Sequence, residues 1–99
     1  MTELVRERWP VLAAQISAAL GTAGEPDLAV QLDNLAVVKQ CVCDDDWCQS
    51  FYTAPLTNGT YGPGHRNVVL EPPWPGLLVL DVVEDRIVYI EVLDRPPLD

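Results

Sequence analysis

The chain has few basic residues and no long apolar run. It carries 6 lysine and arginine residues against 15 aspartate and glutamate residues, which gives a net charge of −9. A chain this acidic repels nucleic-acid phosphates and anionic headgroups, so we expect no DNA, RNA or membrane partner. The apolar runs are too short to span a bilayer, and charged residues interrupt the start of the chain where a signal peptide would be apolar. We therefore expect a soluble, cytoplasmic protein.

The sequence also lacks the motifs that many enzyme classes require. No glycine-rich phosphate loop follows a predicted strand, and no serine lies in a nucleophile elbow. The acidic run at residues 44–46 lacks the alternating ligands, the glycine and the glutamate of an EF-hand loop. A cysteine nucleophile with His65 as its base would have no visible orienting group or oxyanion device. The sequence therefore favours a protein that is not an enzyme.

Length and composition indicate one folded domain. The chain has 99 residues, 48% of them hydrophobic and 21% charged, which is a globular rather than a disordered composition. A second core would leave each half of the chain too small to be stable alone. We expect a single domain over residues 1–99.

Two helices are predicted at the start of the chain. Apolar residues recur there every three to four positions, which is typical of a helix with one face against a core: Trp9, Leu12, Ile16 and Leu20. Pro10 cannot donate a hydrogen bond within a helix. A helix kinked at Pro10 and a helix that begins near Trp9 both fit, and we favour the kink. Pro26 and Asp27 then open a short second helix.

From Leu35 onward the apolar period changes to two, which predicts strands. The predicted strands cover residues 35–43, 48–53, 67–71, 77–83 and 86–93, with a tight turn at Glu84-Asp85 before the last. Val88, Ile90 and Val92 form the predicted buried face of that last strand. The order of elements predicts an α+β fold: an N-terminal helix kinked at Pro10 and a short second helix, packed on an antiparallel β-meander of four to five strands.

Three cysteines occur close together. If Cys43 and Cys48 close a four-residue hairpin loop, they lie opposite each other, and Cys41 points the same way because side chains alternate along a strand. Together with His65 they would form a zinc site, or an aspartate of the loop would replace the histidine. The alternatives are cysteines that only pack as small hydrophobic residues, and a reversible disulfide in a redox protein. The odd number of cysteines favours reduced thiols.

Large aromatic rings on irregular segments are the other candidates. Tyr61 and Trp74 lie in proline- and glycine-rich segments, where such rings either cover the edge of a core or form an exposed anchor for a partner. With His65 they define a candidate partner surface. The favoured function is a binding or accessory module that acts through a protein partner. A zinc-binding protein is the alternative and a cysteine-based redox protein the third. The sequence leaves open a monomer or a homodimer.

Three segments resemble a group of small bacterial proteins without an assigned activity. The hairpin pattern Cys-x-Cys-x4-Cys-x-x-Phe-Tyr begins at Cys41, Gly-Pro-Gly-His occupies residues 62–65, and the pattern Ile-Glu-Val-Leu-x-Arg-Pro begins at Ile90. The resemblance is to proteins found mostly in high-GC actinobacteria and covers nearly the whole chain. It implies a single domain of bacterial, cytoplasmic origin. Because the group has no assigned activity, the resemblance supplies no catalytic residues. Asp44 stands where a glycine usually follows the second cysteine of such motifs.

Overall fold

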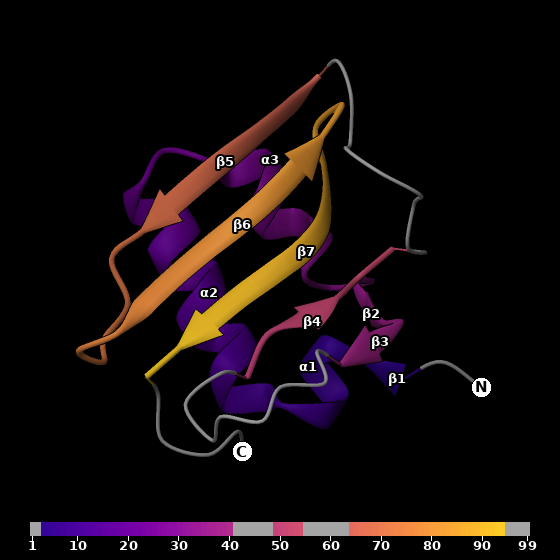
Figure 1. Ribbon diagram of the computed structural model, residues 1–99, viewed down its shortest axis with the longest axis horizontal. Helices are drawn as coiled ribbons and strands as arrows, with labels where there is room; N and C mark the ends of the chain where they lie inside the picture. Colours follow the sequence, from indigo (N-terminus) through magenta and orange to yellow (C-terminus); the bar gives the residue numbers. More distant parts are fainter. Residues whose placement is uncertain (1–2, 41–48, 55–63, 95–99) are drawn as a thin grey trace.

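The computed structural model describes residues 3–40, 49–54 and 64–94 (Figure 1). Helices cover one face of an antiparallel sheet, which confirms the predicted α+β class. In chain order the elements are β1 (Glu3–Leu4), α1 (Val5–Arg8), α2 (Pro10–Thr22), α3 (Pro26–Gln31), β2 (Ala36–Val37), β3 (Lys39–Gln40), β4 (Phe51–Tyr52), β5 (His65–Leu70), β6 (Leu77–Val83) and β7 (Arg86–Leu93). Among these residues, no helix is both long and apolar enough to cross a membrane.

The favoured kinked, continuous helix is corrected: the helix breaks at Trp9 and the longer helix begins at Pro10, as in the alternative of a helix that begins near Trp9. Helix α1 ends at Arg8, and Trp9 has a non-helical backbone with φ −133° and ψ 73°. Helix α2 begins at Pro10, where proline is well suited because the first residues of a helix have no intrahelical partner for their N–H groups. The break lets the buried Trp9 ring reach the core between the two helices.

The sheet is a meander only in part. Its strand order is β3-β4-β7-β6-β5, and β1 pairs with β2 in a separate two-stranded sheet. Strands β5, β6 and β7 are joined in sequence, but β4 pairs with β7 instead of with β5. The predicted meander is therefore corrected. The last strand lies at the centre of the sheet, where Ile90 and Val92 are fully buried.

A β-bulge changes the buried face of β7. The pairing with β6 passes over Val88, so one extra residue stands in β7. An extra residue reverses the alternation of side chains on one side of it. Ile87 is therefore buried with Ile90 and Val92, while Val88 is only half-buried. The prediction of Val88 as a core residue is corrected for this reason.

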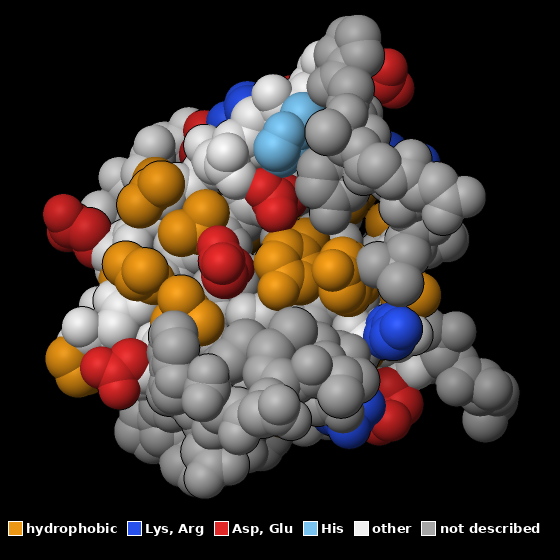
Figure 2. Space-filling view, viewed as in Figure 1, with side chains coloured by type: hydrophobic (Ala, Val, Ile, Leu, Met, Phe, Trp, Pro, Cys, Tyr) orange, Lys and Arg blue, Asp and Glu red, His pale blue; other side chains and the backbone are white. Residues whose placement is uncertain are grey.

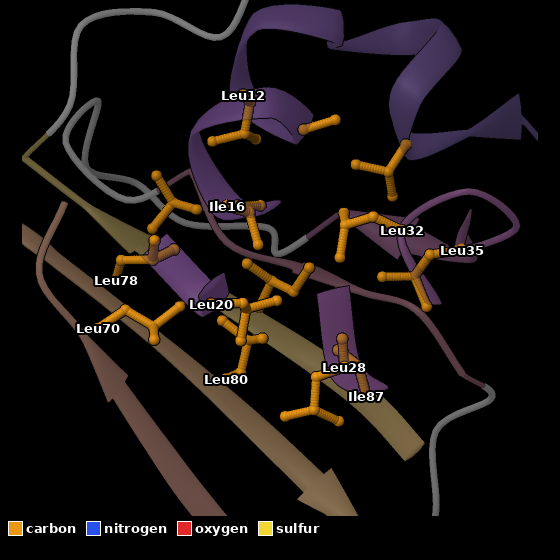
Figure 3. Close-up of a cluster of buried hydrophobic side chains, with 14 of the residues drawn as sticks. Leu12, Ile16, Leu20, Leu28, Leu32, Leu35, Leu70, Leu78, Leu80 and Ile87 are labelled. Carbon is orange, nitrogen blue, oxygen red and sulfur yellow. The ribbon is translucent and has the colours of Figure 1, made fainter. Parts of the chain in front are cut away.

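The core lies between α2 and the sheet. Helix α2 places Leu12, Ile16 and Leu20 against the sheet, and all three side chains are fully buried. Figure 3 shows them directed toward Leu78 and Leu80 of β6. Burying a leucine side chain contributes about 1.5–3 kcal/mol. This face was predicted from the helical spacing, and the structure confirms it.

A polar contact joins α3 to the turn between β6 and β7. The turn residues Glu84 and Asp85 have φ values of 49° and 65°, in the left-handed region that two-residue hairpin turns require. The Gln31 side chain donates to the Asp85 carbonyl oxygen at 2.6 Å and accepts from the Ile87 N–H at 3.0 Å. One side chain thus satisfies a donor and an acceptor of the hairpin and fixes α3 against it.

An ion pair joins β5 to the residue before α3. The Arg66 guanidinium donates to both carboxylate oxygens of Glu25, at 3.0 and 3.1 Å. These hydrogen bonds, and to a lesser degree the positive charge of Arg66, hold the pKa of Glu25 below its ordinary value, although partial desolvation opposes the shift. The same bonds raise the pKa of Arg66. Both side chains remain partly exposed, so the pair is screened by solvent.

We expect Glu25→Gln to lower the free energy of unfolding at neutral pH and to make that free energy depend less on pH in the acidic range. The folded pKa of Glu25 lies below the unfolded value near 4.5. Its contribution is therefore present above that value and is lost as the pH falls through the folded pKa. Urea unfolding of both proteins from pH 7 to about pH 3 measures this. The urea midpoint of wild type is expected to exceed that of Glu25→Gln by a small amount at pH 7 and to equal it at about pH 3.

Asp33→Asn is the control, since it removes the same charge from an exposed residue in the turn that follows α3. The general effect of removing one negative charge from this acidic chain appears in this variant and is subtracted from the effect of Glu25→Gln. A Glu25→Gln variant whose difference from wild type persists at the acidic end would contradict the assignment of the effect to the carboxylate charge.

Candidate interaction surface

No described helix covers the sheet face that points away from α2 and α3. We call it the outer face, and Figure 2 shows it with hydrophobic side chains beside acidic ones. Every second side chain along each strand points to it. Its residues are Lys39 of β3, Tyr52 of β4, His65, Asn67 and Val69 of β5, Leu77, Val79 and Asp81 of β6, and Tyr89 and Glu91 of β7.

A polar cluster lies on the outer face around Asp81. The Oδ1 atom of Asp81 lies 3.0 Å from the Nε2 atom of His65 and also accepts a hydrogen bond from the Asn67 side-chain amide. Asp81 is mostly buried, with its side chain 17% exposed, and both neighbours contact the same carboxylate oxygen. The cluster orients the imidazole ring across the β5–β6 pair. Among the described residues, no group of three or more His, Cys, Asp or Glu side chains could hold a metal ion.

Two tyrosines form an aromatic pair beside this cluster. Tyr52 and Tyr89 are paired across β4 and β7, and their ring centroids lie 4.4 Å apart at an interplanar angle of 38°. Tyr89 is also paired with Asp81, so the rings and the carboxylate lie in one row across the sheet. Tyrosine rings beside a carboxylate provide an apolar surface and a negative charge, which suits a partner with lysine or arginine side chains.

A groove of about 890 Å³ lies between α2 and the end of β5. It is mostly apolar, and among the described residues that line it, Glu71 is the one with a charge. The lining residues are Val11, Ala14, Gln15, Ala18, Ala19, Thr22 and Ala23 on the helix side, and Val69, Leu70, Glu71, Pro72 and Pro73 on the strand side. On the helix side Val11 is 53% exposed, which is high for an apolar residue of this size. The groove is thus a second accessible apolar surface.

Strand β5 is the edge of the sheet beside this groove. The Gly64 carbonyl oxygen accepts a hydrogen bond from the Glu84 N–H at 3.2 Å, so these residues form a hydrogen-bonded pair. Such pairs alternate along an antiparallel ladder. The backbone N–H and C=O groups of Asn67 and Val69 therefore point away from β6. In the described part of the chain, no strand pairs with this edge.

The predicted partner surface is only partly present. Tyr61 lies outside the described residues. Trp74 is 8% exposed, and its indole Nε1–H donates to the Leu93 carbonyl oxygen at 3.1 Å. The expectation of an exposed anchor at Trp74 is corrected, because the ring covers the core edge at the end of β7. Of the three residues, His65 is the one that the structure places on an open face.

The structure does not bring His65 near the residues that border the three cysteines. His65 lies at the end of the sheet where β7 begins, at Arg86. The Gln49 N–H donates to the Val92 carbonyl oxygen near the other end of β7. At about 3.3 Å for each residue these ends are about 20 Å apart. Cys41, Cys43 and Cys48 themselves lie outside the described residues.

Comparison of the chain with protein-family models, with curated proteins and with solved structures found no match. The resemblance to small bacterial cysteine-hairpin proteins therefore stays an expectation. No residue role is transferred from a relative, and the functional argument depends on the geometry of this chain.

Sequence reasoning missed the aromatic pair, the Asp81 cluster and the edge of β5. The alternation along residues 65–70 could have placed Asn67 and Val69 on one face. The contact of Tyr52 with Tyr89 depends on the pairing of β4 with β7. These strands are far apart in the sequence, and no turn or spacing pattern near either strand indicates that they pair. These residues become visible only when the strand order is known.

Proposed function

We propose that this chain is a binding module without enzymatic activity, which acts through a protein partner in the bacterial cytoplasm. The observation that carries the proposal is the outer face of the sheet, where Tyr52 and Tyr89 stack beside Asp81. Paired tyrosines on a rigid sheet provide contact area at a low entropy cost, and such residues are enriched at interfaces. Val69 and Leu77 extend the apolar part of this face.

Charge indicates the kind of partner. The outer face carries the carboxylates of Asp81 and Glu91 against one lysine, Lys39 opposite Tyr52, and the chain as a whole has a net charge of −9. An acidic surface accelerates encounters with basic partners and disfavours acidic ones. The partner is therefore expected to present lysine or arginine side chains to the outer face, near the tyrosine pair.

Site-specific photo-cross-linking tests the proposal. A benzoylphenylalanine placed at Tyr89 in cells is expected to give one discrete cross-linked protein, and Glu91→Lys is expected to reduce its yield. The same group at Val30, which is 67% exposed on α3 away from the outer face, is the control. Equal products from both positions, or none from Tyr89, would contradict a function exerted through this face.

A zinc-binding protein is the second candidate. Lys39 pairs with Tyr52 and Gln40 with Phe51, which is the register assumed by the prediction that places Cys43 opposite Cys48. The proposed ligands are then the three thiolates and an aspartate of the loop, because His65 lies at the other end of the sheet.

Native mass spectrometry with and without a chelator, together with a thiol titration, tests this candidate. One zinc per chain with protected thiols supports it. Metal-free protein contradicts it, and in that protein a fast-reacting thiol at neutral pH would favour the redox function instead.

A further inference from the structure

The edge of β5 and the groove beside α2 form one continuous site. We propose that β5 accepts an extended, basic peptide strand of a partner protein, which pairs with its outer edge and directs alternate apolar side chains into the groove. This inference shares with the proposed function only the premise that the chain binds a protein partner, and it adds a second site, the mode of binding there and the chemistry of the partner segment. Addition of a strand to a sheet edge is a recurring mode of peptide recognition.

The backbone of β5 is suited to pairing. The strand is six residues long and pairs with β6 without any register shift, whereas the opposite edge strand β3 has two residues. Natural edges are usually protected by proline, lysine, a bulge or an inward charge. The one such device in β5 is the inward charge of Arg66, which Glu25 neutralises. No proline, lysine or bulge lies beside the outward backbone groups of Asn67 and Val69. An extended segment could hydrogen-bond to these groups one after another along the edge. A helix or a small molecule could not, because its own hydrogen-bonding groups do not repeat at the spacing of a strand.

The groove is placed to receive the side chains of an added strand. A new strand would lie about 4.8 Å beyond β5, with alternate side chains on the same face as Val68 and Leu70. That face is the helix side of the sheet, where both residues are buried. Ala14 and Ala18 of α2 line the groove there, and their small side chains leave room for aliphatic groups of the incoming strand.

Charges at both ends of β5 define the partner segment as basic. Glu71 follows the strand at the groove end, and Glu84 is hydrogen-bonded to Gly64 at the other end. The basic residue within the strand, Arg66, is engaged by Glu25 on the helix side. A peptide with a lysine or arginine near each of its ends would therefore complement the edge.

The same charges disfavour a second copy of the chain as the occupant. If two β5 strands paired antiparallel about a two-fold axis, Glu71 of each copy would approach the Gly64 end of the other, beside Glu84. Like charges opposite each other destabilise strand pairing. Each copy also carries a net charge of −9. The edge is therefore complementary to a basic foreign strand and not to itself.

A defined peptide tests the inference. The probe is a fluorescein-labelled peptide Lys-Val-Thr-Val-Thr-Val-Lys, compared by anisotropy with the same peptide carrying glutamate at both ends. We expect the lysine peptide to bind at least tenfold more tightly. Glu71→Lys is expected to weaken its binding by several-fold. Glu91→Lys makes the same change in charge on the outer face and is expected to have a much smaller effect.

The backbone contribution is tested at Val69. Val69→Pro removes an N–H that points away from β6, and it is expected to weaken binding at least tenfold, whereas Val69→Thr keeps the N–H and binds as wild type. Amide hydrogen exchange of the wild-type protein gives a readout that does not depend on a variant folding. The Asn67 and Val69 amides are expected to become protected on binding, while the Val68 amide, already bonded to β6, changes little.

Equal binding of the two peptides, or no new protection of the Asn67 and Val69 amides, overturns the inference. A protein dimer that protects these amides without peptide overturns it in favour of self-association. If the cross-link from Tyr89 forms but the lysine peptide does not bind to the β5 edge, this inference is wrong and the proposed function stands. If the cross-link fails while the peptide binds through the edge, the outer-face proposal alone falls.

Discussion

Replacing Gly76 with alanine is expected to lower the free energy of unfolding by about 3 kcal/mol or more. A Cβ atom at this position would overlap the Leu93 carbonyl oxygen and lie 2.7 Å from the Asp94 Cβ atom. The obstacle is backbone and cannot rotate away. Leu93 is also fixed, since it pairs with Leu77 and its carbonyl oxygen accepts the Trp74 indole N–H. Relief of the overlap requires the end of the β6–β7 pair to separate.

Gly21→Ala is the matched control for this prediction. Gly21 lies within α2, and a Cβ atom there would meet nothing within 4 Å. Alanine restricts the unfolded chain and favours the helix, so we expect a gain of about 0.5–1 kcal/mol. Chemical denaturation of both variants measures the two effects, which have opposite signs. Equal tolerance of the two substitutions would show that the Gly76 contact is not rigid.

Phe51→Ala is expected to cost about 3–5 kcal/mol of stability. The Phe51 side chain is fully buried, and its ring centroid lies 4.8 Å from that of Trp9. The substitution removes this aromatic contact and leaves a cavity where α2 begins, beneath the short strand β4. Thermal and urea unfolding measure the loss.

Tyr52→Ala is the control for Phe51→Ala. Tyr52 is the next residue on β4, is half-buried, and points to the outer face. Its removal is expected to cost less than half as much, since no closed cavity forms. If both variants lost the same stability, β4 would depend on its backbone pairing rather than on the side chain beneath it.

Much of the local structure could be predicted from the sequence. The strands β6 and β7 have the predicted bounds, because alternating β-branched residues flank a two-residue turn. Helix α3 begins at Pro26 as predicted, since proline suits the first position of a helix. The buried face of α2 follows the predicted spacing. In each case the signal lies within about ten residues of sequence, where period and turn chemistry decide the conformation.

The features that could not be predicted depend on contacts between distant segments. The bulge at Val88 shifts the alternation of side chains in β7 by one residue. The sequence of a bulged strand does not differ from that of a regular strand, so the bulge becomes visible only when the pairing with β6 is known. Trp74 in a proline-rich connector has the same local sequence whether it covers the core or meets a partner. Its burial follows from the approach of the connector to Leu93.

The candidate surface was predictable to a smaller extent. His65 was identified because it is the one histidine of the chain, but its neighbours Asn67 and Asp81 come from the register of β5 on β6. The open edge of β5 follows from the position of β7 at the centre of the sheet. Since β4 pairs with β7 and not with β5, the edge beside α2 stays accessible.

The central position of β7 also bears on how fast the protein folds. The hydrogen bonds that join Gln31 to Ile87 and Ser50 to Val92 connect residues 56 and 42 positions apart. Chains with such distant contacts pay the entropy of closing long loops before these contacts form, and they fold more slowly than helical bundles of similar length. The β6–β7 hairpin can form locally, whereas α3 and β4 must then dock onto β7 from distant positions in the chain. We expect this docking step to limit the folding rate.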